Sequence, residues 1–395
     1  MQRVTWLGLN LLHALAAPTA SQTRWPILLN AALAVGLAAI AGRTWARATH
    51  QPILGWVAAL SLAVLALADW ILLAGLPRWG LSFGPVQAPW LALVGFRWLA
   101  ALLAAYVASR WRTPALAGLT VFQVGIFALL VYGTAIEPFR TQVSRVEVTS
   151  TKLADPDAPL RIVQLSDLHV ERLTRRERAL PALVAGLSPD IIVLTGDYLN
   201  SSYNTDPCAL ADLRSLLSQF HAPCGVYAVW SAHGPDRVEL LRPMFAELGI
   251  TLLEDRAVEV TTGGHRLWLV GLTWLRSMAG DASTLSALLS GIPRGAFTLL
   301  LYHTPDLMPQ AAALGVDLYL AGHTHGGQWR IPGFGAVLTS SRYWKRYEAG
   351  HYRQGNTDLY VSRGLGMEGS GAPRARFFCP PEVVLLELRG AGSGR

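Results

Sequence analysis

Six side chains that can ligate a metal ion each follow an apolar run in the second part of the chain. They are Asp167, His169, Asp197, His303, His323 and His325. The stretches "LSDLHV" and "AGHTHGGQ" each hold two of them at positions i and i+2, which point to the same side of an extended backbone. Ligands at the carboxyl ends of neighbouring strands converge on one crevice. Imidazole and carboxylate ligands together suit Mn, Fe, Zn or Ni better than calcium.

Each motif alone has an ordinary structural explanation. An isolated Asp-x-His or Gly-Asp commonly caps a loop, and an isolated strand-end histidine is commonly a hydrogen-bonded core residue. The ordered set, with glycines beside the last two histidines, predicts a metal centre instead. Two ions about 3.5–4 Å apart that share one carboxylate form the clamp used for in-line attack on phosphorus.

The elements that must position these residues belong to an α/β domain. "TQVSRVEVTSTKL" alternates apolar and polar residues, as a half-buried strand does. Later runs such as "PDIIVLTGD" are continuous Val, Ile and Leu, which is typical of strands covered on both faces. Helical patterns over 175–186 and 206–220 lie between strands. The pattern predicts sheets sandwiched by helices over residues 141–395.

These motifs, in this order, make residues 142–390 resemble a calcineurin-like metallophosphoesterase. The resemblance is to the bacterial membrane-associated branch that includes phosphodiesterases and UDP-diacylglucosamine pyrophosphohydrolases. The stretch "SRGLGMEGSGAPRARFFCPPEVVLLEL" is similar to the closing segment of that branch. The resemblance implies a four-layer αββα sandwich, two divalent metal ions, and hydrolysis of a phosphodiester or pyrophosphate bond by an activated water.

The resemblance also implies a role for each motif residue. Asp167, His169 and His325 would hold one metal, Asp197 would bridge, and His303 and His323 would hold the other. The family's third block is Gly-Asn-His followed by an acid, and here it reads "SAHG". His233 is then the catalytic histidine, which donates a proton or hydrogen bond to the phosphoryl group or leaving group. The alternative is a polar residue at an ordinary turn.

Two positions of this block depart from the family pattern. Ala232 stands where an amide would ligate the second metal, and Gly234 stands where an acid would orient the histidine. A water could replace the amide, because a catalytic ion commonly keeps an open position. Asp236 and Ser231 are candidate partners of His233.

Three functions are compatible with these residues. The first is a membrane-tethered, metal-dependent phosphoric ester hydrolase whose substrate is a phosphorylated small molecule or a lipid or nucleotide-linked compound. The second is a degenerate family member that binds metal or phosphate with little turnover, because of Ala232. The third is a transporter-like protein with a regulatory soluble domain, supported only by two charges in apolar runs.

Four apolar runs, at about residues 26–42, 53–76, 89–108 and 115–136, predict a membrane domain over residues 1–140 with about four transmembrane helices. A helix needs about 20 residues to cross the hydrocarbon core, so the first run is short. Buried helices of a soluble bundle are the alternative. Residues 4–18 are expected to form an interfacial helix or a poorly formed first helix, with a signal peptide as the alternative.

Asp69 and Arg97 lie inside the second and third of these runs, at similar depth. An isolated charge in lipid is costly, so the two are expected to form an ion pair. The alternative is that Arg97 reaches alone to the interface.

Charge is concentrated in the first third of the chain. Residues 1–140 carry nine Arg, no Lys and two acids, whereas residues 141–395 hold 24 basic and 24 acidic residues. A basic apolar segment fits an anionic membrane better than DNA, so no nucleic-acid partner is expected. The ratio of 31 Arg to 2 Lys points to GC-rich bacterial DNA. We therefore expect a multi-pass protein of the bacterial inner membrane, with the catalytic domain on the cytoplasmic side because slightly more Arg lie on the side of the termini.

Overall fold

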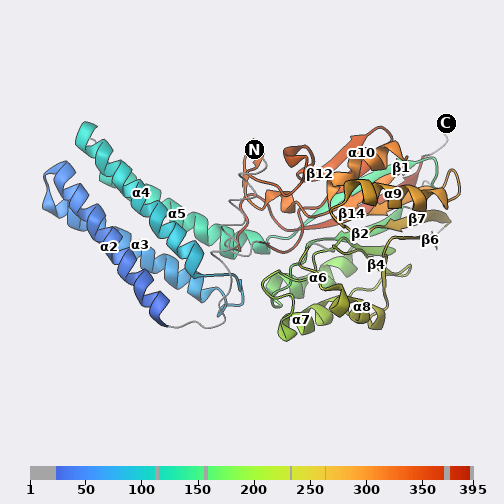
Figure 1. Ribbon diagram of the computed structural model, residues 1–395, viewed down its shortest axis with the longest axis horizontal. Coiled ribbons are helices and arrows are strands. Elements are labelled where there is room, and N and C mark those ends of the chain that lie inside the picture. Colours follow the sequence, from blue (N-terminus) through green and yellow to red (C-terminus); the bar gives the residue numbers. More distant parts are fainter. Residues whose placement is uncertain are drawn as a thin grey trace. The chain divides into compact units, whose positions relative to one another are not determined.

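The structure is a computed structural model that describes residues 24–111, 115–154, 159–231, 234–262, 264–368 and 374–391 (Figure 1). The chain divides into two compact units. One contains Met1–Ile136 with Gly369–Arg374, and the other contains Glu137–Glu368 with Ala375–Arg395. The stretch 4–18 lies outside the described residues.

The first unit holds four long helices. They are α2 (Arg24–Thr49), α3 (Pro52–Gly75), α4 (Gln87–Trp111) and α5 (Ala115–Val131), and α5 runs on into a π-helical turn, Tyr132–Ile136. All four are long and apolar enough to cross a membrane. The expectation that the first run is short is wrong, because its helix continues past Arg43 and Arg47, and the apolar segment Leu28–Thr49 reaches 22 residues.

A buried polar network joins α3, α4 and α5. Arg97 donates from Nε to Asp69 Oδ2 at 2.7 Å and from Nη2 to Asp69 Oδ1 at 2.9 Å. Its Nη1 donates to the backbone and side-chain oxygens of Gln123, whose amide returns a bond to the Arg97 carbonyl. The predicted Asp69–Arg97 pair is therefore confirmed, and Gln123 completes it.

The second unit is built on two mixed six-stranded sheets. The first has the order β1 (Gln142–Ser150), β14 (Glu382–Gly390), β2 (Leu160–Leu165), β3 (Ile191–Leu194), β4 (Val226–Ala228) and β5 (Ile250–Leu252). The second has the order β12 (Gly350–Gln354), β13 (Thr357–Val361), β9 (Leu318–Ala321), β8 (Phe297–Leu301), β7 (His265–Gly271) and β6 (Arg256–Thr262). A small antiparallel hairpin joins β10 (Arg330–Ile331) to β11 (Gly335–Ala336).

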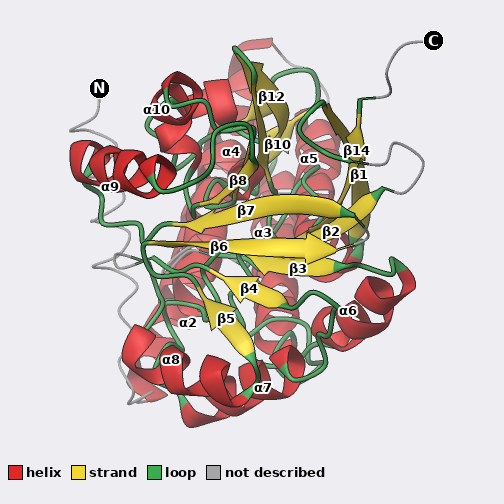
Figure 2. Ribbon diagram, turned by 90° about the vertical axis from the view of Figure 1, so that its right-hand side faces the viewer, coloured by secondary structure: helices red, strands yellow, loops and turns green. Residues whose placement is uncertain are grey.

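Alternation along the strands divides the core into layers. In β2, Ile162 packs in a cluster that draws on strands of both sheets, whereas its neighbour Val163 packs against helices. The helices on that side are α6 (Arg175–Gly186), α7 (Pro207–Leu217) and α8 (Val238–Glu247), and α7 and α8 lie beside β4 and β5 in Figure 2. Helices α9 (Met278–Ser290) and α10 (Met308–Ala313) pack on the second sheet.

Candidate metal centre

The six candidate ligands lie in loops that follow four parallel strands. Asp167 and His169 follow β2, and Asp197 follows β3, its parallel neighbour. In the second sheet His303 follows β8, and His323 and His325 follow the parallel β9. Parallel neighbours end at the same edge of a sheet, so each sheet delivers its ligands to one place.

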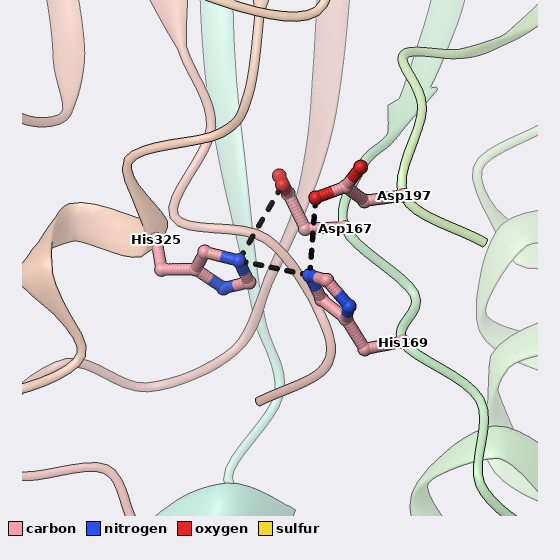
Figure 3. A group of neighbouring side chains, drawn as sticks. All are labelled: Asp167, His169, Asp197 and His325. Atoms are coloured by element: carbon pink, nitrogen blue, oxygen red, sulfur yellow. Dashed lines mark hydrogen bonds and ion pairs between the residues drawn. The ribbon is translucent and has the colours of Figure 1, made fainter. Parts of the chain in front are cut away.

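The first ligand group contains Asp167, His169, Asp197 and His325, whose side chains point toward one another in Figure 3. One ligand atom from each lies within 4.8 Å of the others. The Nε2 atoms of His169 and His325 are 3.0 Å apart. His169 Nε2 is 3.4 Å from Asp197 Oδ2, and His325 Nε2 is 3.5 Å from Asp167 Oδ1.

The second ligand group contains His303, His323 and again Asp197. His303 Nε2 lies 3.3 Å from Asp197 Oδ2 and 3.2 Å from His323 Nδ1. Asp197 Oδ2 is thus close to a histidine of each group. A carboxylate shared in this way can bridge two neighbouring cations.

The backbone at these residues is strained. Five of the ligands have a positive φ: Asp167, His169, Asp197, His323 and His325, between 42° and 68°. Residues with side chains adopt this left-handed region uncommonly, and such strain concentrates at functional sites. Backbone bonds hold the loops in place, since His169 N–H donates to the Asp197 carbonyl and Asp167 N–H to that of Gly196.

Polar neighbours orient the ligands. His303 Nδ1 donates to the Thr195 carbonyl at 2.8 Å, so Nε2 is the ring nitrogen that faces Asp197 and the ligand group. The Asp236 carboxylate accepts the backbone N–H groups of Asp197 and Tyr198 at 3.0 and 2.8 Å. Asp236 therefore fastens the loop that carries the shared carboxylate.

Glu368 is a site residue that the sequence motifs did not reveal. Its Oε2 lies 2.8 Å from His169 Nδ1, so this nitrogen carries the proton and Nε2 faces the ligand group. The side-chain amide of Gln328, three residues after His325, donates to the Glu368 carbonyl and accepts from the Glu368 N–H, both at 3.0 Å. In the sequence, the only indication of their role is that Gln328 and Glu368 lie close to segments already assigned to the site.

The loop after β13 packs directly on the first ligand loop. Leu365 and Gly366 donate backbone N–H groups to the carbonyls of Ser166 and Asp167. A Cβ on Gly366 would overlap the Leu168 carbonyl oxygen and lie 2.7 Å from His169 Cβ. The buried Arg376 guanidinium donates to the carbonyls of Gly364 and Gly366 and keeps this loop in place.

The buried carboxylates and imidazoles of the site shift one another's pKa values. Burial lowers the pKa of His303, but the Asp197 charge outweighs it and raises the pKa to about 10. Burial likewise opposes the raised pKa of His169, which Glu368 brings to about 9. Burial and the neighbouring His303 lower the pKa of His323 to about 3.

Within the described residues the buried Asp197 Oδ1 has no hydrogen-bond partner. Converging imidazole nitrogens and carboxylate oxygens of this kind fit divalent metal ions.

Ala232 and the predicted catalytic His233 lie outside the described residues, so the role of His233 stays a prediction. Their neighbours are informative. A Cβ on Gly234 would lie 2.5 Å from Asp197 Oδ1, which leaves no room here for the acid of the family pattern. The buried Ser231 hydroxyl has no hydrogen-bond partner in the parts of the chain that the structure describes.

Three arginines of the second unit, Arg172, Arg176 and Arg363, each pair with an acidic side chain. Arg172 pairs with Asp206 at 3.1 Å, and Arg363 pairs with Glu382 at 2.9 Å. Arg176 is buried against Glu177.

A different arginine lies near the second ligand group. The exposed Arg276 stacks over the Trp274 ring at 5.1 Å, and that ring lies 4.6 Å from the His323 ring. The sequence motifs did not reveal this pair, because neither residue belongs to a ligand motif.

Comparisons with known proteins agree with this geometry. A profile described as calcineurin-like phosphoesterase matches residues 160–243. Phosphodiesterase YaeI of Escherichia coli is 33% identical over 59% of this chain and 84% of its own length. UDP-2,3-diacylglucosamine pyrophosphatase LpxG of Chlamydia trachomatis is 25% identical over 68% of this chain and 96% of its own. A bovine transmembrane protein with a metallophosphoesterase domain is 29% identical over 65% of this chain and 58% of its own. The chain belongs to the calcineurin-like metallophosphoesterases, a family of hydrolases with an α/β fold.

Proposed function

We propose that the chain hydrolyses a phosphodiester or pyrophosphate bond with the help of two divalent metal ions. The observation that carries this proposal is the shared position of Asp197, whose Oδ2 approaches His169 of one ligand group and His303 of the other. Asp167, His169 and His325 would complete the first site, and His303 and His323 the second. The ions would be Mn, Fe, Zn or Ni, since the donors are imidazoles and carboxylates.

Bound ions would supply an activated water and stabilise the charge that develops on the phosphoryl oxygens. The chain's own residues position the ions and the substrate. His233 is proposed to donate a proton or hydrogen bond to the phosphoryl oxygen or leaving group. Arg276 is proposed to bind the substrate's anionic group beside His323, since guanidinium groups pair well with phosphate. The Trp274 ring, over which the Arg276 guanidinium lies, would hold the arginine in place.

Ala232 removes one expected ligand from the second site. Ser231 Oγ is buried, and the Cβ position of Gly234 lies 2.9 Å from it and 2.5 Å from Asp197 Oδ1. We propose that this hydroxyl and a water take the place of the missing amide. The second candidate function, metal binding with little turnover, rests on the same alanine. Large activation by Ala232→Asn would favour that candidate, whereas a wild type already active, and weakened by Ser231→Ala, favours the first.

We further propose that the catalytic unit is a four-layer αββα sandwich tethered to the bacterial inner membrane on its cytoplasmic side. The mixed core cluster of both sheets and the helices on their outer sides support the sandwich. Four helices long and apolar enough to span support the tether. A tethered site suits a phosphorylated lipid or lipid-nucleotide, and the relative LpxG, a UDP-2,3-diacylglucosamine pyrophosphatase, acts on a compound of this class.

Turnover of a simple substrate tests the proposal. Full-length protein in detergent, stripped of metal and given Mn²⁺, is expected to hydrolyse bis(4-nitrophenyl) phosphate. Asp197→Asn should abolish this, because it weakens both sites at once. Glu239→Gln, at an exposed acid on α8, serves as the control and should retain activity. If the wild type hydrolyses no substrate with Mn, Fe, Zn or Ni, the proposal is rejected.

A further inference from the structure

The hairpin that follows the last metal-ligand motif exposes an unusual number of large apolar side chains. Six residues, which we name the hairpin surface, are 40–63% exposed: Trp329, Ile331, Phe334, Val337, Leu338 and Trp344. Only four other large apolar residues in the described part of the second unit are exposed: Leu240, Leu275, Leu314 and Phe378. A soluble surface rarely collects such residues in one short segment unless it binds something.

Basic residues accompany these apolar ones. Residues 329–347 include Arg330, Arg342, Lys345 and Arg346 and no acid, although residues 141–395 as a whole are balanced in charge. Arg342 and Arg346 are exposed. Lys345 Nζ lies over the Phe334 ring, 3.4 Å from its centroid, and donates to the Phe334 carbonyl. Tryptophan, aliphatic and basic side chains together are the composition of segments that lie in the interface of an anionic bilayer.

The base of the hairpin is fastened, so its apolar tip is presented on a rigid support. Arg330 pairs with Glu348 at 2.7 Å and donates to the Gly326 carbonyl at 3.0 Å. Trp329 donates from its indole to the Ala375 carbonyl, and the Ala336 N–H donates to Glu348. These bonds satisfy the polar groups at the base of the hairpin, whereas the apolar side chains of its tip remain exposed.

The same fastening links the hairpin surface to the metal-ligand loop. Gly326 directly follows His325, and its carbonyl accepts from Arg330. Ser340, on the return side of the hairpin, donates to the His323 carbonyl at 2.7 Å. A surface held by these bonds therefore lies next to the loop that carries two candidate ligands.

We propose that the hairpin surface docks on an anionic lipid bilayer and presents the metal site to the membrane–water interface. This proposal rests on the proposed tether, because the four candidate spans would keep the second unit close to a bilayer at all times. Trp329 and Trp344 would lie at headgroup level, and Ile331, Phe334 and Leu338 would enter the apolar boundary. Arg342 and Arg346 would meet lipid phosphates. The consequence is access to a phosphoryl group held at the interface by its acyl chains.

An environment-sensitive label tests the docking without any turnover. Full-length protein carrying Cys208→Ser and Cys224→Ser is labelled at Phe334→Cys with a nitrobenzoxadiazole fluorophore and placed in lipid nanodiscs. Emission is expected to shift to shorter wavelength, and lipids with nitroxide on the acyl chain are expected to quench it. Both effects should be larger with phosphatidylglycerol present than in phosphatidylcholine alone, because of the basic residues. The same label at Leu240→Cys, an exposed apolar site on α8, is the control and should remain water-like.

Water-like emission at position 334, with the same iodide quenching as at position 240, would overturn the docking. Shielding that persists in detergent and grows with protein concentration would assign the surface to a second copy of the chain and also overturn it. Unfolding temperatures of the labelled and unlabelled proteins show that each variant folds. None of these readouts depends on metal or hydrolysis, so a failed label test is distinct from an inactive enzyme.

Discussion

At the scale of single residues, the chemistry of the site depends on partners that come from distant parts of the chain. The clustering of six Asp and His side chains was predictable from their types and spacing at strand ends, and their role as metal ligands stays a prediction. Glu368 and Arg276 were not predictable, because a lone Glu or Arg carries no pattern until the fold places it beside a histidine. His233 remains a prediction from the sequence.

Glu368→Gln is expected to weaken metal binding. It removes the charge that faces His169 Nδ1 while keeping the shape of the side chain. Loss of such an outer partner typically costs about 10–100-fold in metal affinity or activity. Competition with a chromogenic chelator measures this, and Glu239→Gln, an exposed acid on α8, should leave the affinity unchanged. Equal affinities for all three proteins would show that Glu368 only supports the loop.

Arg276→Ala is expected to raise KM for an anionic phosphodiester by about tenfold with a smaller change in kcat, since a charged hydrogen bond is worth about 1.5–3 kcal/mol. Steady-state kinetics on the soluble ester give both constants. Arg276→Lys should recover part of the loss. Arg294→Ala, at an exposed position far from the ligand motifs in sequence, is the control. An unchanged KM for Arg276→Ala would remove this residue from the substrate site.

At the scale of elements, the strands that bear the site and the edge strand β1 were predictable, whereas the two edge strands of the second sheet were not. Continuous apolar runs predicted β2, β3, β8 and β9, which are covered on both faces. The edge strands β6 and β12 mix exposed and half-buried residues, so hydrophobic pattern alone did not separate them from loops. The end of α2 was misjudged because two arginines interrupt its apolar pattern, although the backbone remains helical.

Gly366→Ala is expected to abolish metal binding, although position 366 ligates nothing. Its methyl group would overlap the Leu168 carbonyl and press on His169, so the first ligand loop must move. Metal content of the purified protein measures the effect. Gly186→Ala at the end of α6 meets no atom within 4 Å and should bind metal normally. Full metal content in Gly366→Ala would contradict the close packing of these loops.

Arg97→Leu is expected to destabilise the helical unit. It leaves the buried Asp69 without its partner, and breaking a buried pair in this way costs about 3–5 kcal/mol. The double variant Asp69→Leu with Arg97→Leu should recover much of the loss, because no charge then remains buried. Unfolding temperatures in detergent compare the three proteins. A single variant as stable as the wild type would mean that the pair is dispensable.

At the scale of the whole molecule, the chain joins a unit of four helices long and apolar enough to span a membrane to a hydrolase unit with an exposed apolar hairpin surface. The amino-acid composition predicted the first, since basic and apolar residues concentrate in residues 1–140. It could not reveal the second, because an exposed apolar residue and a buried one look alike in a sequence. Only the fold separates the six residues of the hairpin surface from the core.

The central claim is that two metal ions act together around Asp197. The most direct test is a titration of Mn²⁺ into metal-free, full-length protein, with the initial rate of phosphodiester hydrolysis measured after each addition. The account predicts little hydrolysis up to one equivalent per chain and a steep rise between one and two equivalents. Full activity at one equivalent, or no activity at any ratio, would contradict it.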